Sequence, residues 1–160
     1  MRLLDASSII YAWDNYPPEQ FPKLWEWIAL EITEEVLVIA QVALQEVRLK
    51  TPECGDWLND HTIDSISPGN AILHLAIDIQ QTLGVSGSHY HPKGVGENDI
   101  IIIATAKHCE CELITNENIQ NNLPQELIKY KIPAVCDLTN VDVQHLDFLQ
   151  YLKQSRQVFG

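Results

Sequence analysis

The sequence is short of positive charge. It has only 10 Lys and Arg residues against 22 Asp and Glu among 160 residues, which gives a formal net charge of −12 at pH 7. A surface of this sign repels nucleic acid and anionic lipid on average. A nucleic-acid substrate would therefore require a local patch of the opposite sign, or metal ions at the site.

Long apolar runs and paired cysteine motifs are also missing. The longest apolar stretch, residues 100–106, is too short to cross a bilayer, and Met1 leads directly into a strand-like run that leaves no room for a signal peptide. The four cysteines include one Cys-x-Cys pair, Cys109 and Cys111, with no second pair at zinc spacing. We therefore expect free thiols, no membrane association and a cytoplasmic location.

The rest of the composition is that of a folded protein. Hydrophobic residues make up 46% of 160 residues, which suits a single domain spanning residues 1–160. Apolar segments predict strands at 2–5, 36–39, 62–66, 112–115 and 141–143. Amphipathic or Pro-initiated segments predict helices at 6–13, 18–32, 41–50, 68–83, 99–108 and 146–154. Short helical turns are predicted at 56–60 and 124–129. This alternation predicts the α/β class, as a three-layer sandwich with a central, mostly parallel sheet.

A long loop is predicted at residues 84–96, which are rich in Gly, Ser, His and Pro. Asn98 then suits the N-cap of the helix that follows. Because loops carried on a rigid scaffold often hold functional residues, we expect this loop to lie near a substrate.

Four acidic residues stand where predicted strands and helices meet, or beside apolar positions of a helix. Asp5 ends the first strand and Glu117 follows the fourth, while Asp99 begins an apolar helix and Glu46 borders the apolar stripe of another. Carboxylates are costly to bury without a compensating charge, and sites in open α/β sheets form beyond the carboxyl ends of the strands. A hard divalent cation is the compensator that suits several carboxylate oxygens at once.

Each acid also has an ordinary structural interpretation. Asp5 can cap the helix that follows it, and Asp99 can complement a helix dipole. Glu46 and Lys50 form an i,i+4 pair in the favourable order, and Glu117 lies in a turn where polar residues are common. Taken singly, only Asp99 favours the functional interpretation, because the rest of its helix is apolar almost all round.

Taken together, these segments resemble a known family. Residues 3–7 (Leu-Leu-Asp-Ala-Ser), 97–106 (Glu-Asn-Asp followed by an apolar run) and 113–117 (Leu-Ile-Thr-Asn-Glu) are similar to the motifs of PIN-domain nucleases, and among them to the VapC-like toxins of prokaryotic toxin–antitoxin pairs. The similarity extends from residue 3 to about residue 143. It implies a Rossmann-like sandwich, an acidic pocket that binds Mg²⁺ or Mn²⁺, and hydrolysis of RNA phosphodiester bonds.

The resemblance also assigns roles by motif position. The catalytic and metal-binding acids would be Asp5, Glu46, Asp99 and Glu117. Ser7 matches the hydroxyl residue that supports the first acid, and Thr115 and Asn116 are expected to orient a carboxylate or a water. The sequence departs from the family at Glu117, where Asp is common, and at residues 118–119, where a further acid often follows, so a second metal would be held loosely.

The expected chemistry is metal-assisted hydrolysis. A divalent ion held by the acids polarises a phosphate oxygen and lowers the pKa of a water for in-line attack. The basic residues expected near the rim, where they would hold the RNA backbone, are Arg48, Lys50, Lys93 and Lys107. The resemblance further implies a small antitoxin protein covering the pocket and the surface near Trp27, and it is compatible with a homodimer.

Two other functions stay open from the sequence. A non-catalytic binding module of the same fold is favoured by the small number of basic residues, and titration with Mn²⁺ would distinguish it. A haloacid-dehalogenase-like phosphohydrolase also begins with Asp at the first strand end, but it needs a second Asp two residues later, where Ser7 stands in this chain.

Overall fold

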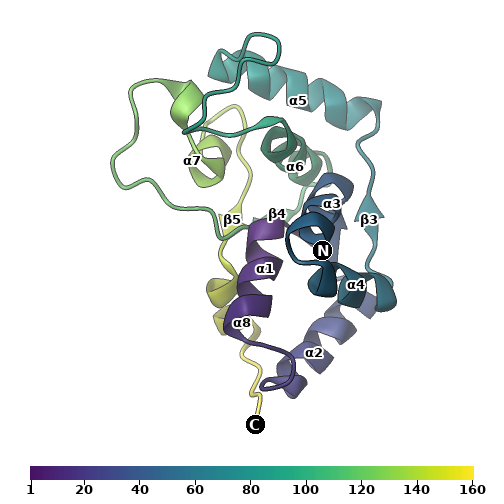
Figure 1. Ribbon diagram of the computed structural model, residues 1–160. Helices are drawn as coiled ribbons and strands as arrows, with labels where there is room; N and C mark the ends of the chain where they lie inside the picture. The colour runs from purple at the N-terminus through teal and green to yellow at the C-terminus, as the bar shows by residue number, and fades with distance from the viewer.

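The computed structural model describes all 160 residues (Figure 1). Its five strands are β1 (Arg2–Leu4), β2 (Leu37–Ala40), β3 (Ser65–Ile66), β4 (Glu112–Ile114) and β5 (His145–Leu146). They form one sheet in the order β3-β2-β1-β4-β5, and every neighbouring pair is parallel. The register places Leu4 beside both Ile39 and Ile114. The predicted α/β class with a central parallel sheet is therefore confirmed.

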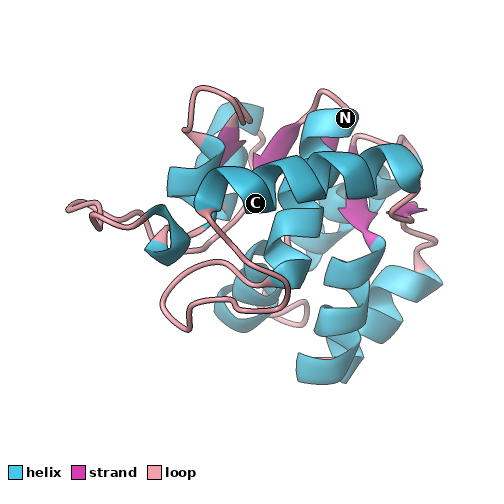
Figure 2. Cartoon of the chain, turned by 90° about the horizontal axis from the view of Figure 1, so that it is seen from above, coloured by secondary structure: helices cyan, strands magenta, loops and turns pink.

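The connections between strands are mostly helical. The helices are α1 (Ala6–Asn15), α2 (Pro22–Thr33), α3 (Gln41–Lys50), α4 (Pro52–Asp60), α5 (Asn70–Leu83), α6 (Glu97–His108), α7 (Ile132–Cys136) and α8 (Phe148–Ser155), with a 3₁₀ turn, η1 (Leu127–Lys129). Figure 2 shows the strands lying among these helices. None of the helices is both long and apolar enough to cross a membrane.

The hydrophobic core is a single cluster of 39 buried residues. All four residues of β2 are buried, and so are six of the twelve residues of α6, as expected for apolar segments without polar alternation. The central strands therefore present polar groups only at their ends. Asp5 follows β1 directly and is only 3% exposed, which places a carboxylate at the carboxyl edge of the sheet.

Several predicted boundaries are wrong. The helix expected from residue 18 begins at Pro22, because a proline is tolerated only in the first turn of a helix. The last strand lies at residues 145–146 rather than 141–143, where Val141 and Val143 are buried outside the sheet. Helix α7 was not predicted, since its five apolar residues carry no helical period.

Candidate functional site

Asp5 occupies the N-cap position of α1, but its carboxylate does not cap the helix. The hydroxyl of Ser8 donates instead to the Asp5 main-chain carbonyl at 2.7 Å. Asp5 Oδ2 accepts hydrogen bonds from Ser7 Oγ at 2.6 Å and from Thr115 Oγ1 at 2.9 Å. The capping interpretation of Asp5 is therefore wrong, and its carboxylate belongs to a network that joins the ends of β1 and β4.

The two hydroxyls of this network are fixed by the turn after β4. Ser7 Oγ lies 3.3 Å from Thr115 Oγ1 and accepts from the Asn116 N–H at 2.9 Å. Thr115 Oγ1 accepts from the Glu117 N–H at 3.2 Å. The side-chain oxygen of Asn116 accepts from the Phe148 N–H at 3.0 Å. Ser7 and Thr115 thus hold Asp5 in place, whereas the Asn116 side chain anchors α8.

Asp99 lies in the first turn of α6, which begins at Glu97 with Gly96 as its N-cap. The prediction of Asn98 as N-cap is therefore wrong by two residues. The reason is that Asp99 Oδ2 accepts from the Gly96 N–H at 2.9 Å, so the helix starts earlier in the chain. Asp99 and Glu46 line one hollow of about 300 Å³ together with residues 96–98.

Glu46 lies on α3 and forms an ion pair with Lys50, one turn further along the helix. The ordinary i,i+4 interpretation is thus correct as far as it goes. The charge of Glu46 nevertheless reaches the other acids, because it helps to raise the pKa of Asp99 and the pKa of Glu117. Glu46 therefore borders the site from the α3 side.

Burial and nearby negative charges disfavour the ionised form of the Asp5 carboxyl. Burial raises its pKa from an ordinary 3.8 to about 6, even though the hydrogen bonds from Ser7 and Thr115 lower the pKa. The charges of Asp99 and Glu117 raise the pKa further. An ionised Asp5 is therefore costly in this environment unless a cation lies beside it.

Asp99 and Glu117 show the same pattern. Burial is the main reason that the pKa of each is raised, and each is also close to other carboxylates. The charges of Lys131 and Lys50 act in the opposite direction on the pKa of both residues. Acids from distant segments thus lie within electrostatic range of one another at the carboxyl ends of the strands, and Lys131 and Lys50 lie near Asp99 and Glu117.

The fit of this site to a metal ion depends on both donor type and spacing. The donors are carboxylate and hydroxyl oxygens, the ligands that a hard divalent cation prefers. No three Asp, Glu, His or Cys side chains lie close enough together to hold a metal as they stand. Asp99 accepts a hydrogen bond from the Gly96 N–H, and Glu46 pairs with Lys50. Asp5, Asp99 and Glu117 are the residues that would hold the ion, since each pair among them is electrostatically coupled.

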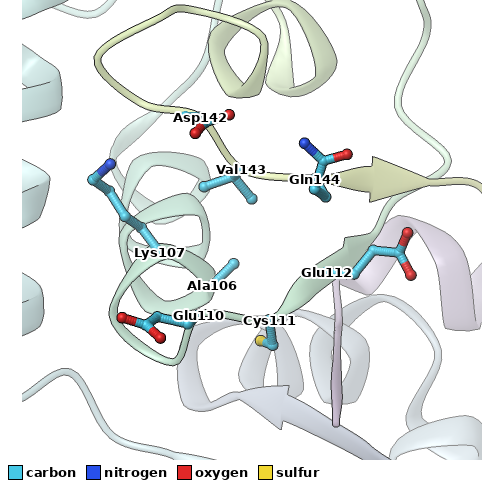
Figure 3. A pocket seen from close by; sticks show the side chains of 8 residues that line it. All are labelled: Ala106, Lys107, Glu110, Cys111, Glu112, Asp142, Val143 and Gln144. Atoms are coloured by element: carbon cyan, nitrogen blue, oxygen red, sulfur yellow. The ribbon is translucent and has the colours of Figure 1, made fainter.

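Lys107 lies near the amino ends of the strands, opposite the ends that carry Asp5. It is near the C-terminal end of α6, and its Nζ donates to the Val141 carbonyl at 2.6 Å. Figure 3 shows it lining a hollow of about 560 Å³ with Glu110, Glu112 and Asp142. Because Glu112 begins β4, this hollow lies at the amino ends of the strands, away from Asp5.

The other basic residues expected at the rim lie in different places. Arg48 donates to Asn59 Oδ1 at 3.1 Å and so lies against α4. Lys50 lies near the acidic site, where its charge lowers the pKa of Asp99 and Glu117. Lys93 lines a hollow with two other lysines. Sequence reasoning missed Lys131, although the alternation Lys129-Tyr130-Lys131 was a signal for an extended basic segment.

The indole of Trp27 is partly buried against aromatic side chains of the same chain. Its ring stacks on Tyr151 with centroids 5.3 Å apart and meets Phe159 at 5.4 Å. A partner that binds near Trp27 would therefore contact this aromatic group as a whole rather than a free indole face.

Comparison with known protein families gives one match. A family model described as a domain of unknown function, DUF4411, matches residues 3–159. The chain belongs to this family. No curated protein matches the sequence.

Solved structures share the fold over nearly the whole chain. VapBC2 from Rickettsia felis, bound to a DNA fragment from their promoter, has a TM-score of 0.54 at 16% identity, covering 91% of this chain and 97% of that one. DNA-bound VapBC from Salmonella typhimurium has a TM-score of 0.55 at 15% identity, covering 92% and 97%. FitAcB from Neisseria gonorrhoeae has a TM-score of 0.53 at 16% identity, covering 93% and 99%. The resemblance to VapC-like PIN domains inferred from the sequence is thus confirmed for the fold.

Proposed function

We propose that this protein is a metal-dependent ribonuclease that hydrolyses RNA phosphodiester bonds, and that it is the toxin of a toxin–antitoxin pair. The observation that carries the proposal is the coupling of acids at the carboxyl ends of the strands, where the charges of Asp99 and Glu117 raise the pKa of buried Asp5 and the charge of Asp99 raises the pKa of Glu117. Coupled carboxylates of this kind are typical of sites that use a cation, and this edge is where α/β sheets form their sites.

The residues of the proposed site have distinct roles. Asp5 is the preorganised ligand, because Ser7 and Thr115 fix its orientation. Asp99 and Glu117 complete the ligand set from α6 and from the turn after β4. Mg²⁺ or Mn²⁺, when bound, supplies charge neutralisation and Lewis acidity toward a phosphate oxygen. Lys131 offers a positive charge to the substrate next to the acids.

The toxin assignment is supported by the structural neighbours VapBC2, VapBC and FitAcB. By analogy with them, we propose that a small antitoxin protein binds this chain and covers the acidic edge. Homodimerisation also stays a proposal. Co-expression with the neighbouring gene tests the pairing, since a true antitoxin co-purifies with the chain and suppresses its nuclease activity.

The nuclease proposal is tested directly by RNA cleavage. The purified protein should cut RNA with Mg²⁺ or Mn²⁺ and stop when EDTA is added. Asp99→Asn should lower the rate more than about tenfold, the scale already seen for residues that only orient metal ligands. Glu112→Gln at the amino ends of the strands is the matched control and should cut at the wild-type rate. Undiminished cleavage by Asp99→Asn would overturn the site.

A non-catalytic binding module is the second candidate, and one observation favours it. No three acidic side chains gather closely enough to hold a metal as they stand. Calorimetric titration with Mn²⁺ decides between the two, since a folded protein that binds no Mn²⁺ and cuts no RNA is the module. The haloacid-dehalogenase alternative is weaker, because Ser7 occupies the position of the second Asp and bonds to Asp5.

A further inference from the structure

Three of the protein's ten Lys and Arg side chains line a single hollow. The hollow measures about 540 Å³, and its walls are Pro92, Lys93, Gln120, Pro124, Lys129 and Lys131. No acidic or aromatic residue is among them. In a chain with a net charge of −12, this clustering creates a local positive field that the overall composition hides.

Two segments far apart in the sequence are locked together to form the hollow. The Val95 N–H donates to the Tyr130 carbonyl at 3.0 Å. A Cβ on Gly94 would lie 1.9 Å from the Ile128 carbonyl oxygen, so only glycine permits this close approach of two backbones. Figure 1 shows the teal segment after α5 meeting the green segment before α7. The position of Lys93 relative to the other two lysines is therefore built into the fold.

Gln120 fixes the main chain that carries the other two lysines. Its side-chain amide donates to the Lys129 carbonyl at 3.1 Å and its oxygen accepts from the Lys131 N–H at 2.8 Å. Tyr130 between them is extended, with φ −68° and ψ 139°. The main chain that carries Lys129 and Lys131 is thus fixed by these two hydrogen bonds.

The positive charge of the hollow is only weakly matched inside the protein. Lys129 pairs with Glu126 at 2.9 Å, but the Glu126 side chain is 63% exposed, and exposed pairs of this kind exchange easily. Lys93 and Lys131 form no ion pair. Lys131 also lowers the pKa of Asp99 and Glu117, so it joins the hollow to the acidic site.

We propose that this lysine hollow binds the phosphate backbone of an RNA strand and leads the strand to the acidic site. That the bound strand leads to the acidic site rests on the proposed nuclease function. That the bound group is a phosphate rests on the chemistry of the hollow itself. Lysines act as point charges toward phosphate, and the lining offers no aromatic face for stacking a base. Binding here is therefore expected to be independent of RNA sequence.

The experiment measures binding of a fluorescein-labelled oligouridylate by anisotropy, with EDTA present so that no cleavage occurs. The Lys93→Gln/Lys129→Gln variant should bind about tenfold or more weakly at low salt. The slope of log affinity against log salt should fall by about 1.4, because each phosphate contact to a single strand contributes about 0.7. The matched control, Lys23→Gln/Lys153→Gln, removes the same charge from α2 and α8 and should behave like the wild type. Equal affinity and slope in the two double variants would overturn the inference.

The two proposals fail in different ways. If the wild type binds RNA through Lys93 and Lys129 but cuts none with Mn²⁺, the nuclease proposal fails and the hollow stands. If Asp99-dependent cleavage keeps the wild-type KM in the Lys93→Gln/Lys129→Gln variant, the hollow inference fails and the nuclease proposal stands. Lys131 is left unchanged because it also acts on the acids, and equal thermal midpoints of the variants exclude a folding defect.

Discussion

The two edges of the sheet carry hollows of different electrostatic character. At the amino ends of the strands, the hollow of about 560 Å³ in Figure 3 is the larger of the two, and two of its four charged residues have partners. Glu112 accepts from Arg2 at 2.8 Å, and Lys107 is bonded to main-chain carbonyls. The other two, Glu110 and Asp142, are exposed to solvent, so charge at this edge is either paired within the chain or hydrated.

At the carboxyl ends of the strands, the hollow beside Asp99 is only about 300 Å³. Here the charges of Asp99 and Glu117 raise the pKa of Asp5, and the hydrogen bonds from Ser7 and Thr115 offset this rise only in part. A buried carboxylate without an ion pair thus distinguishes this edge, not the size of its hollow. Sites for a cation are expected where a fold tolerates such a local cost.

The largest expected effect is a gain in stability when charge is removed at the carboxyl edge. The folded pKa of Asp5 is about 6, above an ordinary 3.8, so the fold favours the protonated carboxyl. Its contribution to stability is present at low pH and is lost as pH rises through about 6. At about pH 8, ionised Asp5 costs about 3 kcal/mol, at about 1.4 kcal/mol per pKa unit, so Asp5→Asn should raise the free energy of unfolding by up to that amount.

Urea denaturation at about pH 8 and about pH 4 measures this gain. The difference between Asp5→Asn and wild type should become small at about pH 4, where wild-type Asp5 is protonated in the folded protein. Mn²⁺ should stabilise the wild type more than the variant. A variant less stable than wild type at the higher pH would show that the hydrogen bonds of Ser7 and Thr115 outweigh the cost of burial.

The centre of the sheet and the placement of Asp5 and Glu117 at the same ends of the strands could be predicted from the sequence. The strands β1, β2 and β4 are apolar runs without alternation, which is typical of parallel strands buried on both faces. Because parallel strands end at the same edge, Asp5 and Glu117 had to lie near one another once β1 and β4 were paired. Local pattern and topology therefore lead to the same edge.

The lysine hollow could not be predicted in the same way. It depends on the contact between Gly94 and Ile128, which are 34 positions apart and joined by no periodic pattern. The residues near 124–129 also lack a clear period and form only a 3₁₀ turn, so the basic face of Lys129 and Lys131 is defined by long-range packing. The hydrogen bond from the Gly96 N–H to Asp99 was also missed, because Asn98 is a better N-cap than Gly96 by residue type.

A smaller effect tests whether the loops at the carboxyl edge form one unit. Gly94→Ala places a Cβ 1.9 Å from the Ile128 carbonyl oxygen, so the two segments must separate. We expect the free energy of unfolding to fall by about 1–3 kcal/mol, the usual cost of overpacking. Gly69→Ser is the matched control, because no atom lies within 4 Å of its Cβ position and Ser suits an N-cap. Equal stability of the two variants would show that the contact at Gly94 does not hold the segments together.

The smallest change in the free energy of unfolding is expected at the amino ends of the strands, and its sign should be opposite to that at Asp5. Glu112→Gln breaks the pair with Arg2, whose side chain is 32% exposed, so the loss is at most about 1 kcal/mol. The Arg2 guanidinium keeps its place over the Tyr151 ring at 5.3 Å, which limits the loss further. Removing one negative charge should thus stabilise the protein at Asp5 and leave it unchanged or slightly weaker at Glu112. Denaturation of both variants in the same buffer measures this contrast, and a stabilising Glu112→Gln would mean that repulsion is spread over the whole acidic molecule rather than concentrated at one edge.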